Sequence, residues 1–181
     1  KRLRFLVEKV LQMSLFERQK ATLKLKELDA NDLIISVANT FALKVEKYGG
    51  TLDLDLDALD STIYVDEMHI TNVLFNLMDN AVKYRRQDVP LALLVRTWNE
   101  NGKLHISVED NGIGIKKEYL KKVFDRFFRV PTGNKHDVKG FGLGLAYVRK
   151  IIEDHKGSIR AEQGNNNIGT KFIITLPLIK S

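Results

Sequence analysis

Three stretches of the sequence carry residue types whose spacing could support chemistry, and the first is Asp110-Asn111-Gly112-Ile113-Gly114. It follows a run in which apolar and polar residues alternate, which predicts a strand from Lys103 to Glu109. A carboxylate at the end of a strand, followed by glycines, lets a ligand approach the backbone closely. Asn-Gly is equally typical of an ordinary turn, so this stretch alone leaves both interpretations open.

The second stretch is Gly140-Phe141-Gly142-Leu143-Gly144-Leu145, which opens a segment with helical periodicity from about Gly142 to Lys156. Glycines at the N-terminus of a helix leave backbone N–H groups open to an anion. The preceding residues, 130–139, contain almost nothing to bury, which predicts a mobile loop.

The third stretch is a predicted helix from Asp66, its N-cap, to about Tyr84. Its apolar face consists of Ile70, Val73, Leu74, Leu77, Met78 and Ala81. Its opposite face consists of Asn72, Asn76, Asn80 and Lys83. Asparagine in a helix interior costs about 0.5 kcal/mol relative to alanine, and a merely solvated face would more naturally carry Glu, Lys and Gln. We therefore interpret the asparagine face as a functional one.

The elements that position these stretches predict an α/β fold, a two-layer sandwich in which one mixed five-stranded sheet carries helices on one face. Further strands are expected at residues 52–56, 61–65, 91–99, 158–163 and 170–176. Further helices are expected at residues 32–48, capped by Asn31 or Asp29, and at residues 116–129. Near the end of the second of these helices, Phe124, Phe127 and Phe128 are expected to anchor in the core and couple the following loop to the sheet. Consecutive strands form hairpin pairs, which excludes a doubly wound sheet.

Composition and charge fit one globular domain with a short appendage. The 181 residues are 44% hydrophobic, and the absence of cysteine excludes disulfides and thiolate metal sites. The net charge of +6 suits a polyanionic partner, but the lysines are scattered, whereas a nucleic-acid binder would need clustered basic and aromatic residues. No apolar run approaches the roughly 20 residues of a membrane helix, and no signal peptide is visible.

Residues 1–26 are expected to form a unit distinct from the domain at residues 27–181. Leu3, Leu6, Val10 and Met13 alternate spacings of three and four, which is the seam of a helix that packs on a partner helix. Residues 16–28 then fit either a short strand or an extended linker. Because the chain starts at Lys1 with this helix under way, we expect it to be a piece of a longer protein.

At four places the sequence resembles the N, G1, F and G2 boxes of sensor histidine kinases. These places are Asn76–Tyr84, Asp110–Gly114, Phe124–Arg129 and Gly140–Leu145, and Gly169–Phe172 resembles the segment before that family's last strand. They follow the family's order across residues 29–181. The resemblance implies a Bergerat-type ATP-binding fold that uses ATP and Mg²⁺.

The same resemblance implies a function and partners. The γ-phosphoryl group of ATP would pass to a histidine and then to an aspartate of a response regulator. The parent protein would be a homodimer, anchored in the bacterial inner membrane, whose dimerisation hairpin meets this cytoplasmic domain. The end of that hairpin would be the helix in residues 1–26. Neither nucleic acid nor direct membrane contact is expected of this chain.

The resemblance also implies roles for single residues. Asp110 would accept a hydrogen bond from the exocyclic amine of adenine, Thr170 would add a hydroxyl, and Gly112 and Gly114 would let the backbone approach the ring. Asn80 would offer an amide oxygen to Mg²⁺, which takes its other ligands from water and phosphates. The remaining nucleotide-binding residues would be Asn76, Lys83, Tyr84, Ile113, Lys139, Gly140, Phe141, Gly142, Leu143, Gly144 and Leu145. Catalysis would involve Asn76, Lys83, Arg126 and Arg129, although a solvated surface explains the arginines nearly as well.

Two observations limit what this chain can do alone. None of the four histidines, His69, His105, His136 and His155, stands in the His-Glu-Leu-Arg-x-Pro context of an acceptor, so the acceptor is expected upstream of this chain. Related gyrase-type ATPases place a glutamate where Asn76 stands, and an amide cannot act as a general base, so hydrolysis should be slow. Two rival interpretations are a serine kinase of the anti-sigma-factor type, which lacks the long helical lead-in, and a nucleotide-sensing interaction module.

Overall fold

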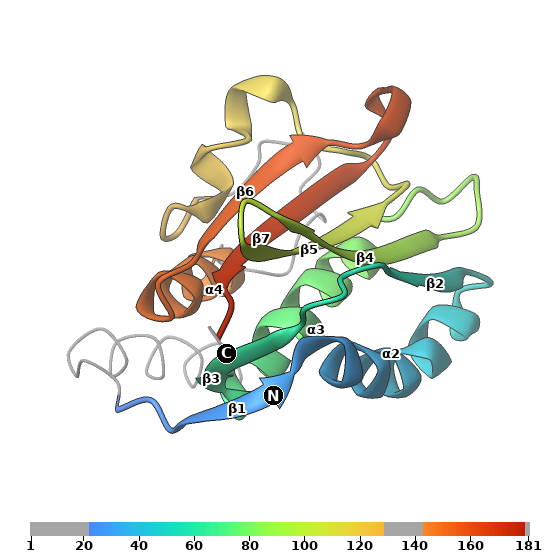
Figure 1. The fold of residues 1–181 in the computed structure, drawn as a ribbon. Helices are drawn as coiled ribbons and strands as arrows, with labels where there is room; N and C mark the ends of the chain where they lie inside the picture. Colours follow the sequence, from blue (N-terminus) through green and yellow to red (C-terminus); the bar gives the residue numbers. More distant parts are fainter. Residues whose placement is uncertain (1–21, 129–142, 180–181) are drawn as a thin grey trace, which may run out of the picture.

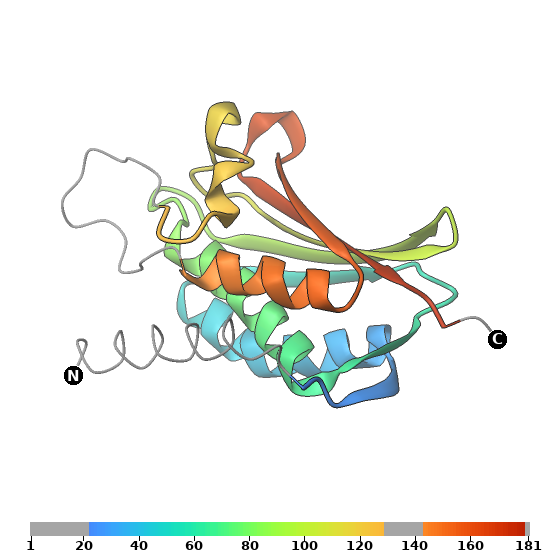
Figure 2. The same ribbon diagram turned by 90° about the vertical axis from the view of Figure 1, so that its left-hand side faces the viewer.

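A mixed five-stranded sheet forms one layer of the molecule, and α-helices form the other (Figures 1 and 2). The computed structural model describes residues 22–128 and 143–179. The sheet order is β2-β4-β5-β7-β6, with bounds β2 Thr51–Leu56, β4 Ala92–Glu100, β5 Lys103–Asp110, β6 Ser158–Gln163 and β7 Thr170–Pro177. The helices on its one covered face are α2 Ala30–Lys47, α3 Glu67–Lys83 and α4 Leu143–Asp154. The predicted two-layer α/β sandwich is confirmed.

Strand pairing differs from the prediction at one place. The sequence predicts a single sheet, but β3 (Thr62–Asp66) leaves it and pairs antiparallel with β1 (Leu25–Asp29) as a separate ribbon. The open question about residues 16–28 is thereby answered for its last part, which is a strand. Strand β2 forms no hairpin with β3. It pairs parallel with β4, while the other neighbouring strands in the five-stranded sheet are antiparallel.

Aspartates begin the two helices that the chain enters from β1 and β3. Asp29, rather than Asn31, is the N-cap of α2, and its carboxylate accepts from the N–H of Asp32 at 3.1 Å. Asn31 instead donates to the carbonyl of Ala58 at 3.1 Å. Asp66 caps α3 as predicted, accepting from the N–H of His69 at 3.1 Å.

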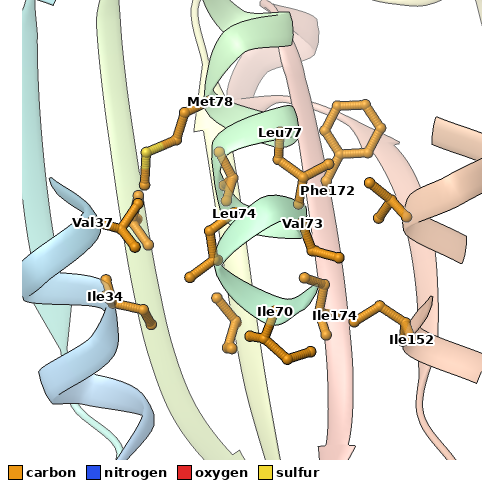
Figure 3. Close-up of a cluster of buried hydrophobic side chains, with 14 of the residues drawn as sticks. Ile34, Val37, Ile70, Val73, Leu74, Leu77, Met78, Ile152, Phe172 and Ile174 are labelled. Carbon is orange, nitrogen blue, oxygen red and sulfur yellow. The ribbon is translucent and has the colours of Figure 1, made fainter. Parts of the chain in front are cut away.

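The core lies around the apolar face of α3, which is the face predicted from the sequence. Figure 3 shows Ile70, Val73, Leu74, Leu77 and Met78 between residues of α2 on one side and residues of β7 and α4 on the other. All five are buried. Because this face is committed to packing, the asparagine face of α3 is turned away from the core, and its Asn76 lies beside Gly144 in the first turn of α4.

The predicted helix over residues 116–129 is wrong. Two short 3₁₀ turns, Lys117–Tyr119 and Lys122–Phe124, stand in its place, because the lysine-rich run offers too few side chains to bury along a whole helix face. Phe124 is buried against Phe172, with ring centroids 6.1 Å apart, and Phe128 packs on the core edge. Phe127 is not a core anchor, since 53% of its surface is exposed.

Candidate functional site

The last residue of β5, Asp110, is a buried carboxylate whose protein hydrogen bonds converge on one oxygen. Its Oδ1 accepts from the N–H of Gly112 at 2.8 Å and from the N–H of Thr170, at the start of β7, at 3.3 Å. Only 8% of Asp110 is exposed. Among the described residues these bonds leave Oδ2 for a donor from outside the protein.

Burial dominates the ionisation of this carboxyl. It raises the pKa of Asp110 to about 6, against the two backbone N–H groups, which lower it, while the nearby charge of Glu109 raises it further. At neutral pH the group is therefore mostly ionised, yet it holds a charge that the surroundings disfavour. A buried carboxyl with a raised pKa is typical of functional sites.

Glycines hold the segment after Asp110 in close contact with the rest of the fold. A Cβ at Gly112 would overlap the carbonyl oxygen of Tyr84, and a Cβ at Gly169 would overlap the carbonyl oxygen of Asp110. Gly114 has a positive φ of 78°, and a Cβ there would lie 3.2 Å from the carbonyl oxygen of Gly169. The turn after β5 and the turn before β7 thus pack on each other through backbone alone.

The same turn is tied to the end of α3. Ile113 donates its N–H to the carbonyl of Tyr84, the residue that ends α3, at 2.9 Å. The side chain of Ile113 is 59% exposed beside the buried Asp110 carboxylate. An exposed aliphatic side chain next to a single buried acceptor is the arrangement that a flat, partly polar ring would need.

On α3, the amide of Asn76 faces the first turn of α4. Its Nδ2 donates to the carbonyl of Asn72 at 2.8 Å, so its Oδ1 is the atom presented outward. A Cβ at Gly144 would lie 3.3 Å from this Oδ1, which places the glycine-containing start of α4 directly against the asparagine face. Asn80 follows one turn later and is half-buried.

Lys83 is already engaged by a carboxylate. Its Nζ lies 3.5 Å from Asp79, whose other oxygen lies 2.7 Å from Nζ of Lys44 on α2. All three side chains are partly exposed, so the pairs are weak and a phosphate can compete for Lys83.

Two residues predicted for the site, Arg126 and Leu145, have contacts within the protein, and several others lie outside the described residues. Arg126 is exposed and places its guanidinium 5.0 Å from the centre of the Phe127 ring. Leu145 packs against the core from a half-buried position. Arg129, Lys139, Gly140, Phe141, Gly142, the loop at residues 130–139 and the helix expected in residues 1–18 lie outside the described residues, and of Leu143 only the backbone is described.

Two residues near the site were not singled out from the sequence. Asn111 is structural, since its amide accepts from Ala92 N–H at 2.8 Å and donates to the carbonyl of Pro90 at 3.0 Å. Tyr147 on α4 meets His69 of α3, with 2.8 Å between its hydroxyl and Nδ1. The signal for Tyr147 was a polar residue on the otherwise apolar stripe of α4.

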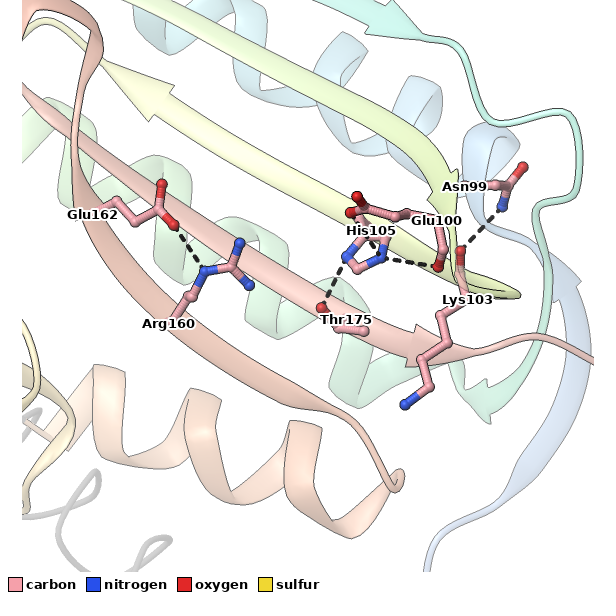
Figure 4. Close-up of polar contacts among 7 residues, drawn as sticks. All are labelled: Asn99, Glu100, Lys103, His105, Arg160, Glu162 and Thr175. Atoms are coloured by element: carbon pink, nitrogen blue, oxygen red, sulfur yellow. Dashed lines mark hydrogen bonds and ion pairs between the residues drawn. The ribbon is translucent and has the colours of Figure 1, made fainter.

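The described histidines are all tied into the fold. Figure 4 shows His105 on the sheet face away from the helices, 3.0 Å from the Thr175 hydroxyl and 3.3 Å from the Glu100 carbonyl oxygen. His155, after α4, is 6% exposed and hydrogen-bonded through both ring nitrogens. None of the three described histidines is thus a free surface side chain of the kind that an acceptor would be.

The chemistry of the available donors fits Mg²⁺ only together with a ligand. No cluster of three or more His, Cys, Asp or Glu able to hold a metal occurs within residues 22–128 and 143–179. Mg²⁺ that keeps several waters and binds phosphates needs only one or two protein oxygens, and an amide oxygen such as that of Asn80 can supply one.

The sequence and the fold both match known proteins. A family model described as histidine kinase-, DNA gyrase B-, and HSP90-like ATPase matches residues 65–180. The chain belongs to this family. Sensor protein RprX of Bacteroides fragilis is 72% identical over all 181 residues, which make up 35% of its length. The chain therefore spans about a third of this curated relative.

Solved structures that resemble this chain are those of histidine kinases. The catalytic domain of histidine kinase ThkA, nucleotide free, has a TM-score of 0.74 and 31% identity, over 86% of this chain and 99% of that one. Full-length ShkA in complex with AMPPNP has a TM-score of 0.83 and 25% identity, over 99% of this chain and 36% of that one. The structure of ThkA in complex with response regulator TrrA has a TM-score of 0.78 and 27% identity, over 98% of this chain and 48% of that one. In sequence and fold the chain is an ATP-binding catalytic domain of the sensor histidine kinase type.

The described part of the chain carries no membrane crossing of its own. Across residues 22–128 and 143–179, no helix combines the length and the apolar content that such a crossing needs.

Proposed function

We propose that this chain binds ATP with Mg²⁺ between the end of β5 and the facing ends of α3 and α4, and donates the γ-phosphoryl group to a histidine on a separate helical hairpin. The observation that carries the proposal is the buried Asp110 carboxylate. Its Oδ1 accepts hydrogen bonds from two backbone N–H groups, and its Oδ2 is left to accept one from a ligand. In the homodimeric parent the hairpin would come from either subunit.

Adenine recognition follows from the hydrogen-bonding character of Asp110. The exocyclic amine of adenine is a donor, whereas guanine carries a carbonyl oxygen at the corresponding position. An ionised carboxylate only accepts, so it favours adenine over guanine. The exposed Ile113 side chain and the backbone of Gly112 and Gly114 would cover the ring.

The phosphates would lie where α3 and α4 meet. Gly144 brings the backbone of the first turn of α4 against the Asn76 amide, and backbone N–H groups at a helix N-terminus attract anions. Asn80 would hold Mg²⁺, which neutralises charge on the transferring group. Lys83 would exchange Asp79 for a phosphate oxygen.

Transfer requires an acceptor that this chain does not offer. An imidazole nitrogen of the acceptor would form a bond to the γ-phosphorus as the bond to the bridging β–γ oxygen breaks, with ADP as the leaving group. Neither amide, Asn76 nor Asn80, can deprotonate water, so hydrolysis should be slow. The phosphorylated histidine would then pass its phosphoryl group to an aspartate of a response regulator, the partner class seen bound to ThkA.

The test separates binding from transfer. Calorimetry on the full chain should show MgATP binding that exceeds MgGTP binding by at least about tenfold. Adding a separate hairpin that carries an acceptor histidine should restore transfer weakly, because the positioning of a shared chain is lost. Efficient phosphorylation of this chain alone on one of its own four histidines would contradict the proposal, and rapid ATP turnover would favour an ATPase instead.

A further inference from the structure

Helices α3 and α4 are joined by a line of hydrogen bonds that starts at the buried ends of the helices and leads to the close approach of Asn76 to Gly144, in the proposed phosphate site. We call this line the α3–α4 seam. It consists of Asp66, His69, Asn72 and Asn76 on the α3 side and Gly144, Tyr147 and His155 on the α4 side. Residues that come later in α3 meet residues that come earlier in α4, so the two helices are antiparallel neighbours (Figure 2).

At the end of the seam that lies farther from the candidate site, His155 joins the two helices. The N–H of Asp66 donates to Nε2 of His155 at 3.0 Å, and Nδ1 of His155 lies 2.7 Å from the carbonyl oxygen of Ile151. A backbone N–H only donates, so Nε2 accepts and Nδ1 carries the proton. This bond between buried groups anchors the C-terminal end of α4 to the N-cap of α3.

In the middle of the seam stands Tyr147. Its hydroxyl lies 2.8 Å from Nδ1 of His69. Burial raises the pKa of Tyr147, and a hydrogen bond with the Asn72 side chain opposes that rise. The hydroxyl therefore bridges two residues of α3 that are almost one helical turn apart.

From Asn72 the line continues directly to the site. The carbonyl of Asn72 accepts from Nδ2 of Asn76 at 2.8 Å, which turns Oδ1 of Asn76 toward Gly144. Tyr147 and Gly144 lie about one turn apart on α4. The Tyr147 hydroxyl is thus linked to both members of this pair: to Gly144 along its own helix, and to Asn76 through Asn72, whose side chain bonds the hydroxyl and whose backbone carbonyl bonds Asn76.

We propose that Tyr147 is a positioning residue of the nucleotide site, whose hydroxyl fixes the first turn of α4 against Asn76. The inference rests on the proposed function, since it assigns the phosphate end of the nucleotide to this place. Loss of the hydroxyl should loosen the phosphate end and leave the adenine end at Asp110 unchanged. A residue that merely stabilised the fold would not separate the two ends.

The test compares a nucleotide with a nucleoside. In Tyr147→Phe the ring stays in place, and MgATP affinity measured by calorimetry should fall about five- to tenfold. Adenosine affinity, measured by NMR titration, should stay within about twofold, since adenosine lacks phosphates. Tyr119→Phe is the matched control: Tyr119 is also half-buried, and its hydroxyl has no hydrogen bond among the described residues, so both affinities should be unchanged.

A double-mutant cycle tests the route through Asn72. If Tyr147 acts through Asn72, then Tyr147→Phe and Asn72→Ala together should weaken MgATP binding no more than the stronger single change. Additive losses, or equal losses for MgATP and adenosine, would overturn the positioning role. An unchanged MgATP affinity in a folded Tyr147→Phe chain would overturn this inference alone. Absence of MgATP binding by the unaltered chain would overturn the proposed function as well.

Discussion

Thr170 donates its backbone N–H to Oδ1 of Asp110 at 3.3 Å, joining two residues that are 60 positions apart in the sequence. The bond links the end of β5 to the start of β7 and fixes the carboxylate before any ligand arrives. Burial nevertheless disfavours the charge of this carboxylate, because it raises the pKa of Asp110 more than the two backbone N–H groups lower it. A change at Asp110 should therefore alter the free energy of unfolding of the protein as well as its affinity for a ligand.

Replacing Asp110 by asparagine should stabilise the protein and abolish ATP binding. The pKa of Asp110 is raised from 3.8 to about 6, so the folded protein retains a proton that the unfolded chain releases between those values. The ionised carboxylate therefore lowers the free energy of unfolding above pH 6, by on the order of 3 kcal/mol at most, and the effect falls to about 0.5 kcal/mol at pH 4. The neutral amide of Asp110→Asn lacks this cost, and its N–H₂ group would face the adenine amine donor to donor.

Urea unfolding at pH 4 and pH 7.5 checks the sign. The free energy of unfolding of the variant should exceed that of the unaltered chain at pH 7.5, and the difference should fall to about 0.5 kcal/mol or less at pH 4. Asp53→Asn, at an exposed position on β2, is the control for a carboxylate-to-amide change outside the candidate site. A gain that is independent of pH at Asp110→Asn would show that the charge is not its source.

Close backbone packing beside Asp110 predicts a second, steric effect. Gly169 and Gly102 have nearly equal positive φ angles of 72° and 71°, but a Cβ at Gly169 would overlap the Asp110 carbonyl, whereas nothing lies within 4 Å at Gly102. Gly102→Ala should cost only the left-handed backbone term of about 1 kcal/mol, while Gly169→Ala should cost roughly 3 kcal/mol or more. Thermal or urea unfolding compares the two, and equal losses would mean that the turns can separate without cost.

Local patterns in the sequence predicted most elements of the fold. The period of α3, its Asp66 cap and the strands β4 and β5 are confirmed. One buried face imposes the patterns of α3 and β4, whereas β5 is buried on both faces. Strand partners were harder, because nothing in Thr62–Asp66 tells whether it pairs with β2 or with β1. The helix predicted at residues 116–129 is wrong because the described part, 116–128, lacks a continuous apolar face, and only Val123 and Phe124 are fully buried in it.

The candidate site divides in the same way. Asp110, Asn76 and Asn80 could be singled out from the sequence because their residue types are unusual at a strand end and on a helix face, and their roles stay predictions. What the sequence could not predict is the convergence of both backbone donors on one oxygen of Asp110, which depends on the approach of Gly169 from a distant part of the chain. Tyr147 was missed because its hydroxyl acts across a helix pair, and helix pairing is not encoded locally.

The buried bond at His155 predicts a loss of stability that a second histidine should not reproduce. His155→Leu keeps a similar volume but leaves the buried N–H of Asp66 without an acceptor, which should lower the free energy of unfolding by about 1–3 kcal/mol. His105→Leu removes bonds to Thr175 and Glu100 that are only partly buried, so their partners can turn to water and the loss should be smaller. Urea unfolding at one pH ranks the two variants, and a larger loss at His105 would contradict the role of the seam.

Removing the Asn80 amide should uncouple ATP binding from Mg²⁺. Asn80 is half-buried on the asparagine face of α3, one turn beyond Asn76, and its amide oxygen is the proposed protein ligand of the ion. In the unaltered chain, Mg²⁺ should strengthen ATP binding over that measured in EDTA, and in Asn80→Ala this ratio should fall to about one. Asn39→Ala, an exposed asparagine within α2, is the control and should keep the full ratio. Calorimetry with and without Mg²⁺ measures all three chains; if Asn80→Ala kept the ratio of the unaltered chain, the ion would have to be bound through other groups.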